Sequence, residues 1–225
     1  MSEAPPDAIG VVDTMGCALP EAIKYLVRKV KRLTGLPVEI HTHNDFGMGV
    51  ATELAAVTAG AEVVHSCVNG LGERTGNAAM EELMVGLHIL LGMKTNYRFD
   101  KIIPLSELVS ELSGVKLANN KPVLGKGNYI RESGIGVDLV MTNPLAMFAT
   151  APRLTGRKAE VVLGKKSGKA SITYMLEQLG IRNASDENVN EILKDVKEKG
   201  TEKKGLLTTD EFNEIIQRKG LSKKS

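Results

Sequence analysis

The sequence is poor in cysteine, has no long apolar run and carries almost no excess of either charge. It contains 2 cysteines among 225 residues, and Cys17 and Cys67 lie far apart in no metal-binding spacing. We therefore expect a reducing compartment and no disulfide framework. No apolar run reaches the roughly 20 residues needed to span a bilayer. Lysine and arginine number 29 against 27 aspartates and glutamates, a balance that indicates neither a nucleic-acid partner nor a membrane partner.

The amino-terminal residues do not resemble a secretion signal. Residues 1–6 have no basic start and no apolar core, so we expect a cytoplasmic protein. The composition, 42% hydrophobic and 25% charged, is ordinary for a globular protein. A chain of 225 residues is long enough to bury a sizeable core.

Three apolar segments, each followed by a helical pattern, predict an α/β fold. The segments are residues 8–14, 37–43 and 61–68. Amphipathic or small-residue helices are expected after each of them. Such alternation favours a parallel sheet covered by helices. Because a closed (β/α)₈ barrel needs eight units, these units belong either to an open doubly wound sheet or to part of a larger barrel.

The strand–helix alternation of the sequence ends near residue 95, and three domains are expected. They are a partial barrel at 1–95, a linker subdomain at 96–165 and a helical subdomain at 166–225. In the last of these, Ser185 and Thr208 are expected to cap helices. The charged residues 197–204 are expected to form a solvated connector.

His41 and His43 lie two residues apart at the end of the second predicted strand. Side chains at positions i and i+2 of a strand project from one face, and two imidazoles held in this way suit a divalent metal. The motif alone is weak, and two unrelated histidines are the alternative. Asp13-Thr14 and Asn69 end the neighbouring strands. Polar groups therefore gather at the edge where (β/α)₈ barrels keep their chemistry.

Four motifs occur in one order and together resemble one enzyme family. They are Asp-Thr-Met-Gly at 13–16, His-Thr-His-Asn-Asp-Phe-Gly at 41–47, Asn-Gly-Leu-Gly-Glu-Arg-Thr-Gly-Asn-Ala at 69–78 and Gly-Lys-Lys-Ser-Gly-Lys at 164–169. From about residue 8 to about residue 217, the chain resembles the metal-dependent isopropylmalate, homocitrate and citramalate synthases. Hydroxymethylglutaryl-CoA lyase is a more distant relative. The resemblance implies the C-terminal part of a (β/α)₈ barrel, about three strand–helix units, followed by an α-rich linker region.

In that family a divalent metal holds a 2-oxo acid and polarises its carbonyl toward the enolate of acetyl-CoA. The resemblance implies that His41 and His43 are metal ligands and that Asn77 lies beside or on the metal. Thr14 would help to hold the substrate carboxylate. His65, in the middle of the third strand, is expected to be a packed residue. The sequence leaves open which 2-oxo acid is used and whether the metal is Zn²⁺, Mg²⁺ or Mn²⁺.

The glycine-rich loop after the third strand has two implied roles. Glu73 and Arg74 would be catalytic residues, and an ordinary loop ion pair between them is the alternative. Gly70, Gly72 and Gly76 let a backbone approach a ligand closely, and a phosphate of coenzyme A is one candidate ligand.

The chain departs from the family pattern in two places. The family's first strand carries Asp-Arg-Glu, whose aspartate is the third protein ligand, and no Asp-Arg-Glu occurs here. About five strand–helix units, including the general acid/base glutamate, are missing by this comparison. The synthases also carry a histidine where Gly136 follows Ser133-Gly134-Ile135, and a glycine cannot transfer protons. Arg131 could bind a carboxylate or thioester oxygen there, or it could be an ordinary surface arginine.

We therefore expect an acyltransferase that condenses acetyl-CoA with a 2-oxo acid and is inactive as an isolated chain. Its expected partners are an N-terminal barrel half, on a separate chain or lost, and a second copy bound through the linker region. A lyase or aldolase on the same scaffold is the first alternative. The second is a non-catalytic fragment or subunit, from a split or truncated gene, that contributes His41 and His43 to a site completed elsewhere.

Overall fold

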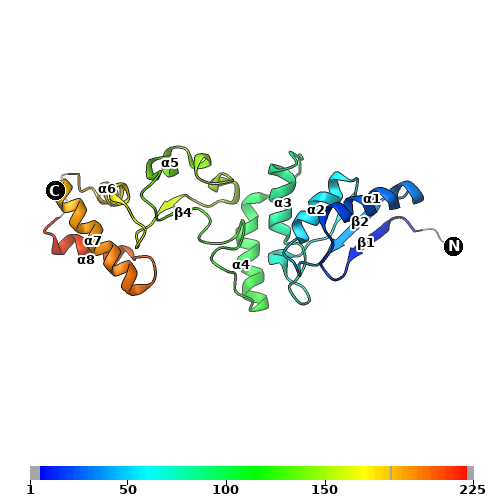
Figure 1. Cartoon of the computed structure of the whole chain (residues 1–225), viewed down its shortest axis with the longest axis horizontal. Helices are drawn as coiled ribbons and strands as arrows, with labels where there is room; N and C mark the ends of the chain where they lie inside the picture. Colours follow the sequence, from blue (N-terminus) through cyan, green and yellow to red (C-terminus); the bar gives the residue numbers. More distant parts are fainter. Residues whose placement is uncertain (1–5, 183, 222–225) are drawn as a thin grey trace. The chain divides into compact units, whose positions relative to one another are not determined.

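The structure is a computed structural model, and it describes residues 6–182 and 184–221. Contacts divide the chain into two compact units, Met1–Gly125 and Lys126–Ser225, whose α-helices and some of whose strands are labelled in Figure 1. The three domains expected from the sequence stay a prediction, because the two compact units do not test the boundaries of a linker and a helical subdomain. Over the described residues, every helix is too short or too polar to cross a membrane.

The first unit begins with three strand–helix pairs, as the sequence predicts (Figure 1). The strands β1 (Ile9–Asp13), β2 (Val38–Thr42) and β3 (Val63–Val64) form a parallel sheet in the order β1-β2-β3. The helices that follow them are α1 (Pro20–Thr34), α2 (Gly49–Thr58) and α3 (Met80–Ile89). The α/β class is thereby confirmed, whereas a place for this sheet in a (β/α)₈ barrel stays a prediction.

The third strand is shorter than the expected segment 61–68. It ends at Val64, and Cys67 instead forms an isolated bridge with Ala79. A short 3-10 helix, η1 (Val68–Gly70), opens the glycine-rich loop, and Asn69 at its centre has a positive φ of 62°. The loop therefore turns back toward the start of α3 soon after the strand ends.

Strand β2 alternates between two faces. Val38, Ile40 and Thr42 are buried on the face that α1 and α2 cover, and Glu39 and His41 point the other way. The covered face holds a core of buried apolar side chains: Val11, Ile23, Val27, Val38, Ile40, Ala56 and Ala61. The opposite face is open within the described residues, and there Val12 is 57% exposed and Val63 41% exposed. Parallel sheets are normally covered on both faces.

The first unit ends with a helix that packs near the glycine-rich loop. After η2 (Phe99–Lys101), α4 runs over Ile102–Ser113 and ends at Gly114, whose φ of 71° is left-handed. Its Ser106 is buried and hydrogen-bonds to Asn69 at the start of the loop, both through the hydroxyl (2.5 Å) and through the backbone carbonyl (3.0 Å). The helix thus supports the left-handed turn that begins the loop.

The second unit combines a small strand pair with a helical core. Strands β4 (Ile130–Arg131) and β5 (Glu160–Val161) pair in parallel. The helices are α5 (Val137–Thr142), the short 3-10 turns η3 (Pro144–Ala146) and η4 (Pro152–Thr155), α6 (Lys169–Gln178), α7 (Asp186–Lys203) and α8 (Thr209–Arg218). The expected caps form: the Ser185 hydroxyl accepts from the Asn188 N–H at 3.1 Å, and the Thr208 hydroxyl accepts from the Glu211 N–H at 3.2 Å.

The expectation of a solvated connector at 197–204 is wrong. Helix α7 continues to Lys203, with Val196 and Gly200 buried. The expectation rested on the density of charged residues, and Gly200, of a type that disfavours helix interiors, lies inside the helix. In the structure a Cβ at this position would lie 2.7 Å from the backbone nitrogen of Lys165. Only glycine fits this close approach, and the helix continues past it.

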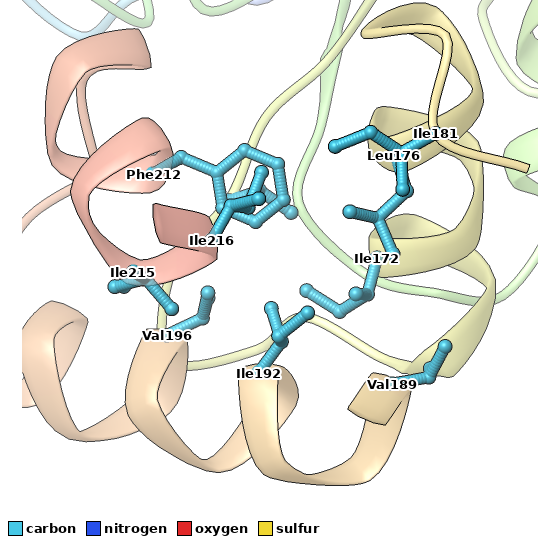
Figure 2. Close-up of a cluster of buried hydrophobic side chains, with 10 residues drawn as sticks. Ile172, Leu176, Ile181, Val189, Ile192, Val196, Phe212, Ile215 and Ile216 are labelled. Carbon is cyan, nitrogen blue, oxygen red and sulfur yellow. The ribbon is translucent and has the colours of Figure 1, made fainter. Parts of the chain in front are cut away.

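Figure 2 shows how α6, α7 and α8 share one core. Ile172 and Leu176 of α6 point toward Ile192 of α7 and Phe212 of α8 (Figure 2). Each of these four side chains is at most 1% exposed. The three helices therefore stabilise one another through apolar packing.

Replacing Ile192 by alanine is expected to destabilise the second unit by about 2–5 kcal/mol, because it empties a fully buried site between three helices. The exposed Lys197→Ala change in the same helix is the matched control and is expected to cost no more than about 0.5 kcal/mol. Urea denaturation, monitored by circular dichroism, measures the free energy of unfolding of both variants. Equal costs for the two variants would contradict this account of the core.

Candidate metal centre

The two histidines of the β2 motif lie side by side at the end of the strand. The ring centroids of His41 and His43 are 5.2 Å apart, with the planes nearly perpendicular at 87°. The backbone N–H of His43 donates to the Asp13 carbonyl at 3.2 Å, which fixes the residue beyond the strand end. The structure thus brings together the two side chains that the strand period placed on one face.

Asn77, at the far end of the glycine-rich loop, lies beside His43. Its backbone forms an antiparallel bridge with His43. Its side-chain nitrogen donates to the Cys67 sulfur at 3.3 Å and to the Leu71 carbonyl at 3.2 Å. The amide is therefore oriented with its oxygen away from these partners. That oxygen, Oδ1, and the His43 Nδ1 are both buried and lack a hydrogen-bond partner among the described residues.

This donor set fits a divalent metal but does not complete its coordination. Two imidazoles and an amide oxygen are ordinary ligands for such ions, and a buried acceptor without a partner is unfavourable unless something binds it. In the described part of the chain, no group of three His, Cys, Asp or Glu side chains is placed to hold a metal. A divalent metal held by these three donors would need at least one further ligand, for which the sequence predicts a carboxylate.

The pKa of His41 is lowered below its usual value. Burial is the main cause, and the neighbouring charges of His43 and His65 act in the same direction. A lowered pKa keeps the ring neutral near pH 7, and the neutral imidazole is the form that binds a metal.

The expectation that His65 is a packed residue is wrong. Its ring centroid is 5.6 Å from that of His41, and its Nε2 lies 3.5 Å from a carboxylate oxygen of Glu39. It is exposed just beyond the end of β3, where its backbone N–H donates to the Ile40 carbonyl at 3.0 Å. The position of His65 in the sequence does not show that its side chain lies near His41 and Glu39.

Arg74 clamps the loops that follow the three strands. Its Nε and Nη2 donate to the two oxygens of Asp45 at 2.9 and 3.1 Å, and Nη2 also donates to the Thr14 carbonyl at 2.6 Å. The hydrogen bonds from Arg74 hold the pKa of Asp45 below its usual value. Arg74 adopts a φ of 57°, an uncommon conformation for a residue with a side chain.

The alternative interpretation, an ordinary ion pair between Glu73 and Arg74, does not describe the structure. Arg74 pairs with Asp45, and Glu73 is exposed at the tip of the loop. Thr14 is also exposed, at the carboxyl end of β1. Arg131 lies in the second unit, where its Nε donates to the Ile135 carbonyl at 3.2 Å. Catalytic and substrate-binding roles for these four residues stay predictions.

The glycines of the loop are required by the loop's own fold. Gly70, Gly72 and Gly76 have φ values of 70°, 154° and 85°. A Cβ on Gly76 would overlap the Gly70 carbonyl, and a Cβ on Gly72 would overlap the side-chain nitrogen of Asn77. These glycines let the loop close around Asn77, and their role in binding coenzyme A stays a prediction.

Two family models match the chain in succession. Residues 1–109 match the model described as HMGL-like, and residues 123–204 match the homocitrate synthase post-HMGL domain-like model. The chain is 41% identical over 217 residues to 2-isopropylmalate synthase of Methanocaldococcus jannaschii, which covers 95% of this chain and 42% of the relative. It is 37% identical over 211 residues to homocitrate synthase AksA of Methanopyrus kandleri, covering 94% of this chain and 53% of the relative.

A solved structure gives a shorter match. An HMG-CoA lyase from Acenitobacter baumannii is 31% identical, with a TM-score of 0.43, over 47% of this chain and 37% of that one. The chain spans about half the length of the curated relatives named above, 42% and 53% of them respectively.

Replacing Arg74 by alanine is expected to loosen the loop that carries Asn77, because it removes the contacts to both Asp45 and Thr14. We expect severalfold faster amide hydrogen exchange at Gly76 and Asn77, with core amides of α1 unchanged. Arg74→Lys is expected to rescue little, since an ammonium group cannot reproduce the planar fork. Exchange at wild-type rates in Arg74→Ala would contradict the clamp.

Proposed function

Because the chain belongs to the HMGL-like family of 2-isopropylmalate and homocitrate synthases, we propose that it supplies the metal-binding edge of an acyltransferase. The reaction is a Claisen-type condensation of an acyl-CoA, with acetyl-CoA as the first candidate, and a 2-oxo acid. The observation that carries this proposal is the cluster of His41, His43 and Asn77, in which two buried polar atoms, His43 Nδ1 and Asn77 Oδ1, lack a partner among the described residues.

His41, His43 and the Asn77 amide oxygen would hold a divalent cation, Zn²⁺, Mg²⁺ or Mn²⁺. The cation, when bound, supplies a Lewis acid for the 2-oxo carbonyl. The chain's own residues prepare this site. The lowered pKa of His41 keeps its ring neutral, and the bonds from Asn77 to Cys67 and Leu71 orient its amide oxygen.

The loops around the cluster would handle the rest of the substrate. The exposed hydroxyl of Thr14, at the end of β1, is proposed to help hold the substrate carboxylate. Glu73, at the exposed tip of the glycine-rich loop, is proposed to be a catalytic residue. The glycines of that loop, Gly70, Gly72 and Gly76, are proposed to let coenzyme A approach the backbone. Arg74 acts by holding these loops together through Asp45 and the Thr14 carbonyl. Arg131, in the second unit, is proposed to bind a carboxylate or thioester oxygen.

The proposed enzyme needs an N-terminal barrel half, from another chain or another part of the same protein. Strands β1 and β3 are both edges of the sheet in the described residues, and an open edge and face favour pairing with further strands. A hollow of about 450 Å³ beside β3 is lined by Val64 and by apolar residues of α3 and α4: Met80, Leu83, Met84, Leu87, Ile102 and Leu105. The missing half would cover this surface and bring the missing carboxylate ligand.

A second copy is the other proposed partner. Helix α4 lies in the segment expected to form the linker, and it leaves Leu108 50% exposed and Leu112 77% exposed. Apolar side chains gathered on one exposed helix face are typical of interaction surfaces. This face is the surface proposed for a homodimer.

Two alternatives share the same scaffold. Gly136, with a φ of 75°, stands where the synthases carry a histidine, and this leaves room for a lyase or aldolase that cleaves a carbon–carbon bond. The second alternative is a non-catalytic subunit that contributes His41 and His43 to a split enzyme. Screening the assembled protein for free coenzyme A release and for cleavage of 2-alkylmalates distinguishes these outcomes.

Replacing His41 by alanine is expected to weaken Zn²⁺ or Mn²⁺ binding at least about tenfold, because it removes one of two imidazole ligands. His65→Ala is the matched control, an imidazole on the same face whose loss is expected to cost much less. Calorimetric titration of the metal into the chain, alone and with an N-terminal barrel half, measures both. Equal losses in the two variants would contradict the ligand assignment.

The isolated chain is expected to show no turnover, because it lacks both a carboxylate ligand and a general acid/base from the missing strands. The assay follows free thiol release from acetyl-CoA with a panel of 2-oxo acids, in the presence of each metal. Turnover by the pure 225-residue chain would refute the need for a completing half.

A further inference from the structure

Glu53 is a carboxyl group inside the first unit. It lies in α2, whose other side chains are mostly small or apolar, and it is 0% exposed. Buried carboxylates are rare unless a cation or several donors compensate for the lost hydration. Glu53 forms no ion pair within the described residues, so its burial calls for another explanation.

The contacts of the Thr42 hydroxyl favour a proton on Glu53. The Thr42 hydroxyl oxygen lies 3.1 Å from the Glu53 Oε1 and 3.1 Å from the Gly49 carbonyl oxygen. A hydroxyl has one proton, and the Gly49 carbonyl can only accept. Both contacts are hydrogen bonds if Thr42 donates to Gly49 and Glu53, as the neutral acid, donates to Thr42. The other carboxyl oxygen, Oε2, is buried without a partner in the described residues, a position that a charged carboxylate tolerates poorly.

Electrostatics agrees with this arrangement. Burial raises the pKa of Glu53 to about 8, against smaller opposing effects from Thr42 and the backbone of His65. No charged side chain from the sheet, from α1 or from α3 is among the groups that act on it. The acid is therefore mostly neutral at pH 7.

Thr42 connects Glu53 to all three candidate metal donors. It is the residue between His41 and His43. Its backbone carbonyl accepts from the Ala78 N–H at 3.2 Å, and Ala78 follows Asn77. A displacement of Thr42 would therefore move both imidazoles and the end of the loop that carries the amide oxygen.

We propose that Glu53, as a neutral carboxylic acid, is a positioning residue that anchors Thr42 to α2 and thereby sets the spacing of His41, His43 and Asn77. The inference rests on the proposed function for the identity of the donors, but the anchoring itself does not require a metal. Glu53 acts through Thr42 and touches neither ligand nor substrate.

The anchoring is tested by hydrogen exchange on the whole chain without metal. Glu53→Ala and Thr42→Val are expected to speed exchange of the Ala78 amide at least severalfold. The Glu62 amide, which donates to the Val38 carbonyl at the other end of β2 at 2.9 Å, is expected to change much less. Glu53→Gln is expected to restore protection at Ala78, because its neutral amide can donate to the Thr42 hydroxyl.

The protonation state is tested by the ¹³C shift of the Glu53 carboxyl carbon during a pH titration. Its midpoint is expected near 8. A group whose folded pKa exceeds its unfolded value binds protons more tightly when folded, so stability is greatest below the unfolded pKa of about 4.5 and falls as pH rises toward 8. The unfolding equilibrium constant is expected to grow by at most about tenfold per pH unit in this window, and Glu53→Gln should remove that dependence.

Glu81→Gln is the matched control. Glu81 is also buried, with a pKa raised by burial, but it accepts from the Asn69 N–H in the loop rather than contacting β2. Its change should leave exchange at Ala78 unaltered. Ala78 exchange at wild-type rates in Glu53→Ala, or a carboxyl midpoint near 4.5, overturns the proposal.

Metal titration separates this inference from the proposed function. If the chain binds Zn²⁺, we expect affinity in the order wild type and Glu53→Gln above Glu53→Ala. Equal affinity in all three would overturn the positioning role. If no metal binds with or without a completing half, the proposed function fails, whereas the exchange and carboxyl measurements still decide the anchoring of Thr42.

Discussion

The two-residue period of strand β2 is the constraint on which both the core and the candidate metal centre depend. Val38 and Ile40, each 0% exposed, pack among the core side chains of the first unit, and this fixes the direction of Glu39 and His41. A one-residue slip of β2 against β1 would expose the core and bury the histidine together. Packing of the apolar side chains therefore also determines where the candidate ligand His41 points.

Polar contacts between loops continue this order beyond the strand ends. The His43 N–H donates to the Asp13 carbonyl, and the Asn44 N–H donates to the Gly76 carbonyl at 2.9 Å. Arg74 adds its fork to Asp45. Loops that follow parallel strands are usually the variable part of such a fold. Here each is tied to the next, so the donors are placed by a network and do not depend on one flexible segment.

Local signals in the sequence predicted what depends on local physics. The strand–helix alternation, the shared face of His41 and His43 and the caps at Ser185 and Thr208 follow from periodicity and from side-chain hydrogen bonds close in sequence. The partner of Arg74 does not, because Asp45 lies 29 residues away. The charged residues 197–204 indicate a connector, and the close approach of Gly200 to Lys165 cannot be seen from them. Glu53 reads as an ordinary helix residue, since full burial of a carboxyl is a property of tertiary packing.

The open face of the sheet joins assembly to metal binding. Val12 pairs with His41 across the sheet and Val63 pairs with Glu39, so the exposed apolar residues and the candidate ligand share one face. In the proposed assembly, further strands would cover this face and gain apolar burial. The same burial would remove water from His41, whose pKa is already lowered mainly by burial. A ring held more firmly in its neutral form binds a metal at lower pH. Since a ligand that binds only the assembled form also stabilises it, metal binding and closure of the sheet would reinforce each other.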